Sequence, residues 1–298
     1  MAEETIETTL TSLEGRADST EIAFFGGSFT GIDRGLMVSL LDLAESYVAD
    51  GRVSGIRMST RPDYIDDEII GILKNYTVNA VELGIQSTSD RVLKASKRGH
   101  TSEISFKAMT MLKEAGFSVV GQMMIGLPSS TPEDEIKTAE DICACGAIGS
   151  RIYPTIVFRD TELYDMALRG EYTPLDVENA VIRSADVLEV FDKHNIECIR
   201  IGLCDTENLH SDKTYYAGPN HPALGEMIIG EVFYKKFLEE ISKIEKKDNI
   251  TIYVSKGSAS AAVGHKKRNK IRLSEKFGIR HIRFIEDESL FGSEFRIE

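Results

Sequence analysis

The chain has 298 residues, of which 42% are hydrophobic, and its 48 acidic and 35 basic residues give a formal net charge of −13. This composition supports a sizeable core and excludes disorder as the main state, and no apolar run reaches the ~18 residues of a membrane span. The opening residues, MAEETIETTL, resemble no secretory leader, so we expect a cytoplasmic protein without a membrane partner. The negative charge repels polyphosphate at long range and does not support RNA binding, which would need a local basic patch.

Short apolar strands alternate with amphipathic helices over the first two thirds of the chain. Six runs are predicted to be buried parallel strands: 21–27, 54–59, 79–86, 118–127, 150–157 and 197–203. Helical spacing lies between them, at about 34–50, 66–75, 88–97, 102–115, 132–145 and 176–194. This order predicts a parallel sheet with helical crossovers, and periodicity alone does not distinguish an open sheet from a curved barrel.

The helix at 34–50 illustrates the expected packing. Asp33 is predicted to cap its start. Its buried face is predicted to consist of Leu36, Leu40, Leu43 and Tyr47.

The pattern weakens after residue 204. A polar loop at 205–222 precedes a helix at about 223–246, a strand at 250–255, a helix at 264–277 and a strand at 281–286. We therefore predict two domains, an α/β domain at 1–204 and a small C-terminal α/β extension at 205–298. The basic stretch at 264–270 is interpreted either as a solvated face or as a phosphate contact at a helix start.

Polar and glycine-rich segments follow the predicted strands at the end where a barrel carries its active site. Gly26 and Gly27 would let the backbone approach a ligand closely, although a tight turn explains them equally well. Neither a G-x-G-x-x-G fingerprint nor a phosphate-binding loop is present. Arg61 is predicted either to bind a carboxylate of a ligand or to pair with Asp63 or Glu82.

Glu82 and Gln86 are four apart in one strand and are predicted to share a face. Buried polar groups are costly unless they are satisfied, which favours a polar ligand or a polar network there. Gln122 is either a buried hydrogen-bonding anchor or a ligand contact, and Arg151 adds a second arginine on the next strand.

The ordered set GGSFTG, STRPDYI, VELGIQS, RGHT, GQMMIGLPSST, RIYPTIVFRDTELY and IRIGL resembles the radical S-adenosylmethionine (SAM) superfamily, and more narrowly the radical-SAM domain of the Elongator catalytic subunit. The resemblance implies a partial (β/α)6 TIM-like barrel that binds SAM at the strand carboxyl ends. It also implies a [4Fe–4S] cluster that cleaves SAM reductively to a 5′-deoxyadenosyl radical, with flavodoxin or ferredoxin as electron donor. The substrate is left open, with an RNA base as one candidate.

Matching the family's motifs assigns cofactor contacts residue by residue. Gly26 and Gly27 would hold the methionine amino group through backbone carbonyls. Ser59, Arg61 and Gln86 would lie among the polar positions around the ribose and the carboxylate.

The same matching extends to the adenine. Gln122 and Met124 would lie on the strand that contacts this ring, with Tyr153 beside it. No residue is assigned as a catalytic acid or base.

The sequence departs from the family at the cluster ligands, which the superfamily supplies from three cysteines in a C-x-x-x-C-x-x-C-like loop. Cys143, Cys145, Cys198 and Cys204 do not have this spacing, so we predict reduced, buried or partly buried thiols and no metal ligand.

The family's first strand and cysteine loop would lie before Met1. The chain is therefore expected to be a truncated and inactive form of a radical SAM enzyme, lacking the first strand of the barrel. The alternative is a cluster-free barrel that binds SAM or a nucleoside without radical chemistry. A third option, an aldolase or isomerase barrel, would need a Lys or a His/Glu pair inside the strands, where only Glu82 is found.

Overall fold

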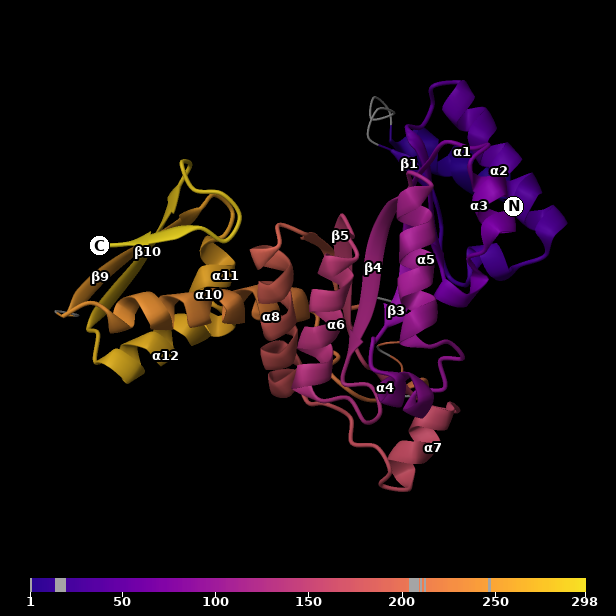
Figure 1. Ribbon diagram of the computed structural model, residues 1–298. Coiled ribbons are helices and arrows are strands. Elements are labelled where there is room, and N and C mark those ends of the chain that lie inside the picture. Colours follow the sequence, from indigo (N-terminus) through magenta and orange to yellow (C-terminus); the bar gives the residue numbers. More distant parts are fainter. Residues whose placement is uncertain (1, 14–19, 204–208, 210, 212, 246–247) are drawn as a thin grey trace. The chain divides into compact units, whose positions relative to one another are not determined.

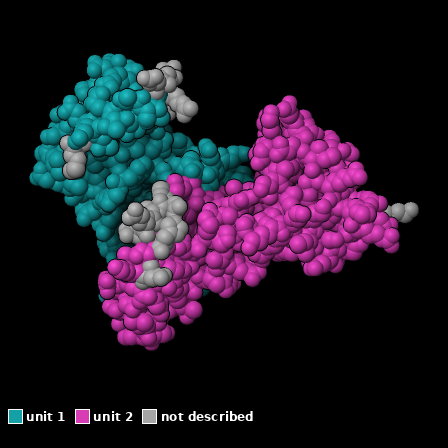
Figure 2. Space-filling model, turned by 180° about the vertical axis from the view of Figure 1, so that it is seen from behind, with its two compact units in different colours: residues 1–152, 191–199 teal, residues 153–190, 200–298 magenta. Residues whose placement is uncertain are grey.

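The computed structural model describes residues 2–13, 20–203, 209, 211, 213–245 and 248–298. Two compact units divide the chain, one of residues 1–152 and 191–199 and the other of residues 153–190 and 200–298 (Figure 2). The domain boundary at residue 204 stays a prediction. Within the described ranges, no helix combines the length and apolar character that a membrane crossing requires.

A six-stranded sheet in the order β1-β2-β3-β4-β5-β7 forms the centre of the fold (Figure 1). Its strands are β1 (Glu21–Phe24), β2 (Gly55–Thr60), β3 (Val78–Gln86), β4 (Ser118–Ile125), β5 (Gly149–Pro154) and β7 (Glu197–Ile201). The pairs from β1 to β4 are parallel. All six predicted strands are confirmed, with shifted ends.

Helices connect these strands at the positions that the periodicity predicts. They are α2 (Arg34–Ala49), α3 (Asp67–Leu73), α4 (Asp90–Ala95), α5 (Ser102–Glu114), α6 (Pro132–Ala144) and α8 (Val177–Lys193), with α1 (Ala2–Ser12) before β1. Asp33 caps α2 as predicted, accepting a hydrogen bond from the Leu36 backbone nitrogen at 2.9 Å.

The predicted buried face of α2 is partly wrong, because Leu36 is 52% exposed. The buried positions of this helix are Met37, Leu41, Ala44 and Tyr47. The stripe facing the sheet therefore begins at Met37 and follows the i, i+4, i+7 spacing of a helix face.

The two faces of the sheet differ in burial. On β4, Val119, Gly121 and Met123 are buried on one face, whereas on the other face Val120 is buried and Gln122 and Met124 are partly exposed. A Cβ atom on Gly121 would overlap the Ile142 side chain of α6, so the buried face is the one that helices cover.

The opposite face, called the open face below, carries Arg57, Ser59, Glu82, Gln122 and Arg151. Strand register places Ser59 beside Glu82 and Gly84 beside Gln122. Parallel sheets that helices cover on both faces are nearly continuously apolar. Here Glu82 is buried, but the other four side chains are partly exposed, so this face is not fully covered.

The sheet is curled as in a partial barrel. Phe25 directly follows β1, and Arg151 lies on β5, four strands away. In a flat sheet these strands would be about 19 Å apart, given about 4.8 Å between neighbours. The guanidinium carbon of Arg151 nevertheless lies 5.3 Å from the centroid of the Phe25 ring, a contact that requires β1 and β5 to curve toward each other.

The second unit contains a hairpin of β6 (Val157–Phe158) and β8 (Tyr215–Ala217), and a sheet in the order β10-β9-β11. Its remaining elements are α7 (Glu162–Leu168), α10 (Leu224–Ser242), β9 (Asn249–Ser255), α11 (Ala259–Val263), α12 (Arg268–Phe277), β10 (His281–Asp287) and β11 (Phe295–Ile297). Phe233 and Phe237 of α10 share a core with Ile252 and Leu273.

The predicted α/β extension is present with one interrupted helix. Residues 264–277 do not form a single helix, because Gly264, Lys266 and Lys267 have positive φ and α12 begins only at Arg268. The short strands β6, β8 and β11 were not predicted. The predicted loop at 205–222 is partly wrong, because β8 lies within it, and its residues 205–208, 210 and 212 lie outside the described residues.

Replacing Gly121 with alanine tests the packing of α6 on the sheet. We expect Gly121→Ala to lower the free energy of unfolding by about 1–3 kcal/mol, because the new methyl group overlaps Ile142. Gly71→Ala is the matched control, because among described residues no atom lies within 4 Å of the added Cβ in α3. Gly71→Ala should raise the free energy of unfolding by about 0.4–1 kcal/mol. If urea unfolding gives the same change for both variants, the assigned packing is contradicted.

Candidate functional site

A row of ion pairs crosses the open face. Arg57 contacts Glu21 at 2.7 Å and Glu82 at 3.4 Å. Arg151 reaches the same Glu82 carboxylate at 2.6 and 2.9 Å, and the Glu82 side chain is 1% exposed. A buried carboxylate is tolerated when it is paired, so of the two alternatives for Glu82 the structure contains the polar network.

Gln86 ends β3 in an unusual conformation. The register with β4 shifts between Gly84 and Gln86, and Gln86 has φ of 67°, a left-handed value that is uncommon outside glycine. Its Nε2 lies 2.9 Å from the position of a Cβ on Gly84, so the side chain lies over that glycine. Gln86 is 4% exposed, and its Oε1 has no hydrogen-bond partner among the described residues.

Two residues of the RGHT motif, to which the sequence analysis assigned no role, lie beside Gln86. His100 is 5% exposed, with Nε2 3.3 Å from the Ile85 carbonyl oxygen and Nδ1 4.0 Å from Asp63 Oδ1. Arg98 places Nη2 3.7 Å from the Cβ position on Gly84. Arg98 Nε and His100 Nδ1 are buried and lack hydrogen-bond partners within the described ranges.

Burial sets the electrostatics of this cluster. It lowers the pKa of His100, which favours the neutral imidazole, and it lowers the pKa of Arg98, with the nearby Arg61 guanidinium acting in the same direction. A carboxylate bound beside Arg98 would offset both effects on the arginine.

Arg61 pairs with Asp63, one of the structural alternatives for this residue. Its Nε and Nη2 contact the Asp63 carboxylate at 2.9 and 2.7 Å, and these hydrogen bonds raise the pKa of Arg61. Two guanidinium groups and one carboxylate therefore meet near Gly99 and Gly84. This local excess of positive charge suits an anionic ligand group.

The glycine pair after β1 leaves space for a ligand. Gly26 has φ of 99°, and within the described parts of the chain no atom lies within 4 Å of a Cβ built on Gly26 or Gly27. Thr30 anchors this loop, contacting the Thr60 hydroxyl at 2.7 Å and donating to the Tyr64 carbonyl oxygen at 2.8 Å. Contacts of Thr30 with β2 and the segment after it thus hold the backbone near the glycine pair, while the space around Gly26 and Gly27 stays free of described atoms.

Helix α6 fixes the loops that follow β3 and β4. The backbone nitrogen of Thr88 donates to the Thr138 hydroxyl at 3.0 Å, and the Gly126 nitrogen donates to the Glu135 carboxylate at 2.7 Å. Buried Glu135 was not predicted as a structural residue. These bonds hold the rim of the sheet in place.

Apart from Tyr153, the predicted cofactor residues fall into three groups. Arg61 and Gln86 lie in the cluster with Arg98 and His100, whereas Gly26 and Gly27 follow β1. Ser59, Gln122 and Met124 are on the open face of β2 and β4. Tyr153 continues β5 but belongs to the second unit. Their contacts with a cofactor stay predictions.

The cysteines do not fit an iron–sulfur cluster. Cys143, Cys145 and Cys198 are partly buried and form no disulfide among the described residues, and burial raises the pKa of Cys143 to about 11. Cys204 lies outside the described residues. Across the described ranges, no three His, Cys, Asp or Glu side chains are grouped so that they could hold a metal ion.

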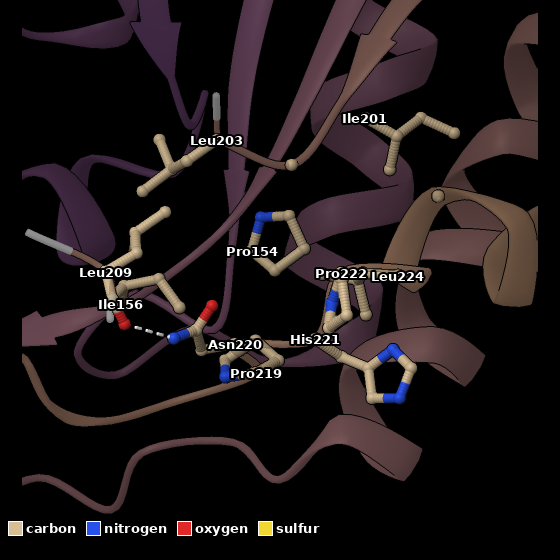
Figure 3. A pocket seen from close by; sticks show the side chains of 12 residues that line it. Pro154, Ile156, Ile201, Leu203, Leu209, Pro219, Asn220, His221, Pro222 and Leu224 are labelled. Carbon is tan, nitrogen blue, oxygen red and sulfur yellow. Dashed lines mark hydrogen bonds between the residues drawn. The ribbon is translucent and has the colours of Figure 1, made fainter. Parts of the chain in front are cut away.

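A cavity of about 80 Å³ lies in the second unit (Figure 3). Pro154, Ile201 and Leu224 contribute to its mostly apolar lining, and Asn220 donates from Nδ2 to the Leu209 carbonyl oxygen at 2.5 Å. His221 accepts a hydrogen bond from the Ala223 nitrogen at 3.0 Å. The described residues of this lining offer apolar packing and include no carboxylate, lysine or arginine.

Two family models match the chain. The model of the radical SAM superfamily matches residues 1–142, and the model of the radical SAM C-terminal domain matches residues 148–233. The archaeal Elp3 of Methanocaldococcus infernus with its N-terminal residues 1–46 deleted aligns with a TM-score of 0.65 and 26% identity, covering 80% of this chain and 58% of that one.

Curated relatives give consistent similarities. The tRNA uridine(34) acetyltransferase of Methanocaldococcus jannaschii is 36% identical over 136 residues, 45% of this chain and 25% of that protein. Elongator complex protein 3 of Homo sapiens is 33% identical over 135 residues, 43% of this chain and 25% of that protein. The chain thus spans about a quarter of the length of these relatives.

The lowered pKa of His100 predicts a pH-dependent stability. The unfolded chain, with a pKa of about 6.5, takes up the proton more readily than the folded protein. The stabilisation by neutral His100 is therefore complete above pH 6.5 and is lost as the pH falls below it, by at most about 1.4 kcal/mol per pH unit. Urea unfolding at pH 7.5 and 5.5 should show a larger loss for the unsubstituted chain than for His100→Gln, and equal losses would contradict the burial effect.

Proposed function

The chain belongs to the radical SAM superfamily, and from this premise we propose that it binds S-adenosylmethionine at the carboxyl edge of its parallel sheet. The observation that carries the proposal is the meeting of three buried polar atoms without partners among described residues, Gln86 Oε1, Arg98 Nε and His100 Nδ1. Buried polar groups are normally hydrogen-bonded, so these atoms are suited to a polar ligand. Barrel enzymes bind their ligands at this edge.

The proposed contacts follow from charge and position. Arg98 pairs with the carboxylate of the methionine moiety, and Arg61, held by Asp63, adds positive potential. Gln86 contacts the carboxylate or a ribose hydroxyl. The open backbone at Gly26 and Gly27 accepts hydrogen bonds from the ammonium group.

The remaining predicted residues complete the cofactor contacts. Ser59 is proposed at the polar end of SAM, whereas Gln122 and Met124 are proposed to contact the adenine from β4. Tyr153 is proposed to lie beside them.

For the chain as given, the proposal covers binding and orientation of SAM. In the family a [4Fe–4S] cluster supplies the electron that cleaves SAM, and the described cysteines do not fit such a cluster. We extend the proposal to radical chemistry only for a form in which three further thiolates hold a cluster, with flavodoxin or ferredoxin as electron donor. The second candidate is a barrel that binds SAM or a nucleoside without radical chemistry.

We propose an RNA base as the substrate class. The support comes from relatives named for tRNA modification and from the basic segment before α12, where Lys266 and Lys267 are exposed. Because the formal net charge is −13, RNA binding would depend on such a local patch.

Calorimetric titration with S-adenosylhomocysteine tests the proposed cofactor site. This product analogue keeps the carboxylate, ribose and adenine of SAM. Arg98→Gln should weaken its binding about 10- to 150-fold, the range that corresponds to about 1.5–3 kcal/mol for a hydrogen bond to a charged group. Arg169→Gln, which removes a surface ion pair with Glu171 in the second unit, is the control and should bind like the unsubstituted chain. Equal affinities for all three proteins would contradict the role of Arg98.

Binding of unfractionated tRNA at several salt concentrations tests the proposed substrate class. Replacing Lys266 and Lys267 with glutamine should weaken binding and reduce the slope of log K against log salt by about 1–2, because each phosphate contact releases counterions. Lys74→Gln removes an exposed charge in the first unit and should leave the slope unchanged. If Lys74→Gln loses as much tRNA affinity as the variant with Lys266 and Lys267 replaced, the loss is a general charge effect.

A further inference from the structure

Phe25 is an exposed aromatic residue at the carboxyl edge of the sheet. It directly follows β1 and is 51% exposed, although its neighbour Phe24 stacks on Phe29 at a centroid distance of 4.3 Å. The Arg151 guanidinium covers the Phe25 ring at 5.3 Å. Phe25 therefore has one partner on the open face while much of its side chain remains accessible.

The Arg151 side chain that contacts this ring is itself held in place. Its Nε and Nη2 contact buried Glu82 at 2.6 and 2.9 Å. Glu82 is held in turn by Arg57, whose Nε contacts Glu21 at 2.7 Å. A guanidinium fixed by a buried carboxylate provides a rigid backing for the ring, so a second flat group could stack without reorganising the support.

We propose that Phe25, backed by Arg151, is a stacking platform for the ring of a nucleobase. Aromatic side chains bind bases through their faces, and every purine or pyrimidine offers such a face. Gly26 and Gly27 next to the ring carry no side chain, and among described residues other than their chain neighbours no atom lies within 4 Å of their Cβ positions. The inference rests on the proposed function, since the base belongs either to the cofactor or to a nucleoside substrate.

Fluorescence can report on stacking directly, because the chain contains no tryptophan. Phe25→Trp places the only indole at the platform, and Leu36→Trp places one at a comparably exposed position on α2 as the control. The probes are S-adenosylhomocysteine, adenosine monophosphate and uridine monophosphate. We expect at least one probe to quench the Phe25→Trp emission saturably and to leave the Leu36→Trp emission unchanged.

The probes distinguish the sources of the base. Quenching by S-adenosylhomocysteine assigns the platform to the cofactor adenine, whereas quenching by a nucleotide alone assigns it to the substrate. Absence of quenching by all three probes, or equal quenching in both variants, overturns the proposal. If a nucleotide quenches while S-adenosylhomocysteine does not bind the unsubstituted chain, the cofactor proposal fails and the platform stands.

Conservative substitutions separate stacking from simple burial of apolar surface. Phe25→Leu keeps an apolar side chain but removes the ring, and it should weaken binding of the quenching probe about 5- to 150-fold by calorimetry. Phe25→Tyr keeps the ring and should bind within about threefold of the unsubstituted chain. If both variants fold normally and Phe25→Leu binds the probe as tightly as Phe25→Tyr does, the stacking proposal is overturned.

Discussion

The pairing of Glu82 with Arg57 and Arg151 is the interaction on which the open face depends. Glu82 is buried in the middle of a parallel sheet, where an unpaired carboxylate would be strongly destabilising. Removing one partner of a buried ion pair typically costs about 3–5 kcal/mol. The pairing with Glu82 therefore holds both arginine side chains in place. Because Arg151 reaches from β5 to β3, the pairing also links strands that are not neighbours.

At the carboxyl edge of the sheet, in contrast to Glu82, buried polar atoms lack partners among the described residues. Gln86 and His100 are buried there and Arg98 is half-buried, and each has a buried polar atom that no described residue satisfies. Helix α6 and the Thr30–Thr60 contact hold the surrounding loops. An unsatisfied buried polar atom costs about 1–3 kcal/mol. A rigid rim around groups that lack partners is the arrangement expected of a preformed binding site. The net charge of −13 is a poor guide to this site, because two guanidinium groups and one carboxylate determine its local field.

Sequence periodicity predicted the repeating elements well and their exact contacts less well. The six strands and the helices between them follow from apolar spacing, because burial against neighbouring elements imposes it. Leu36 was assigned to the wrong face because several apolar side chains of α2 compete for the sheet. The helix at 264–277 was predicted as one element because positive φ at Lys266 and Lys267 leaves no mark in hydropathy. Arg98 and His100 belong to the quoted RGHT motif but were assigned no role, because their place in the site depends on tertiary interactions with Asp63 and Ile85.

A crystal structure of the chain with S-adenosylhomocysteine at saturating concentration tests the central claim most directly, because that claim concerns a place in the fold. The account predicts the ligand at the carboxyl edge of the sheet, with its carboxylate on Arg98 and with a hydrogen bond to Gln86. Ligand density elsewhere, with Gln86, Arg98 and His100 making no contact to it, would contradict the account.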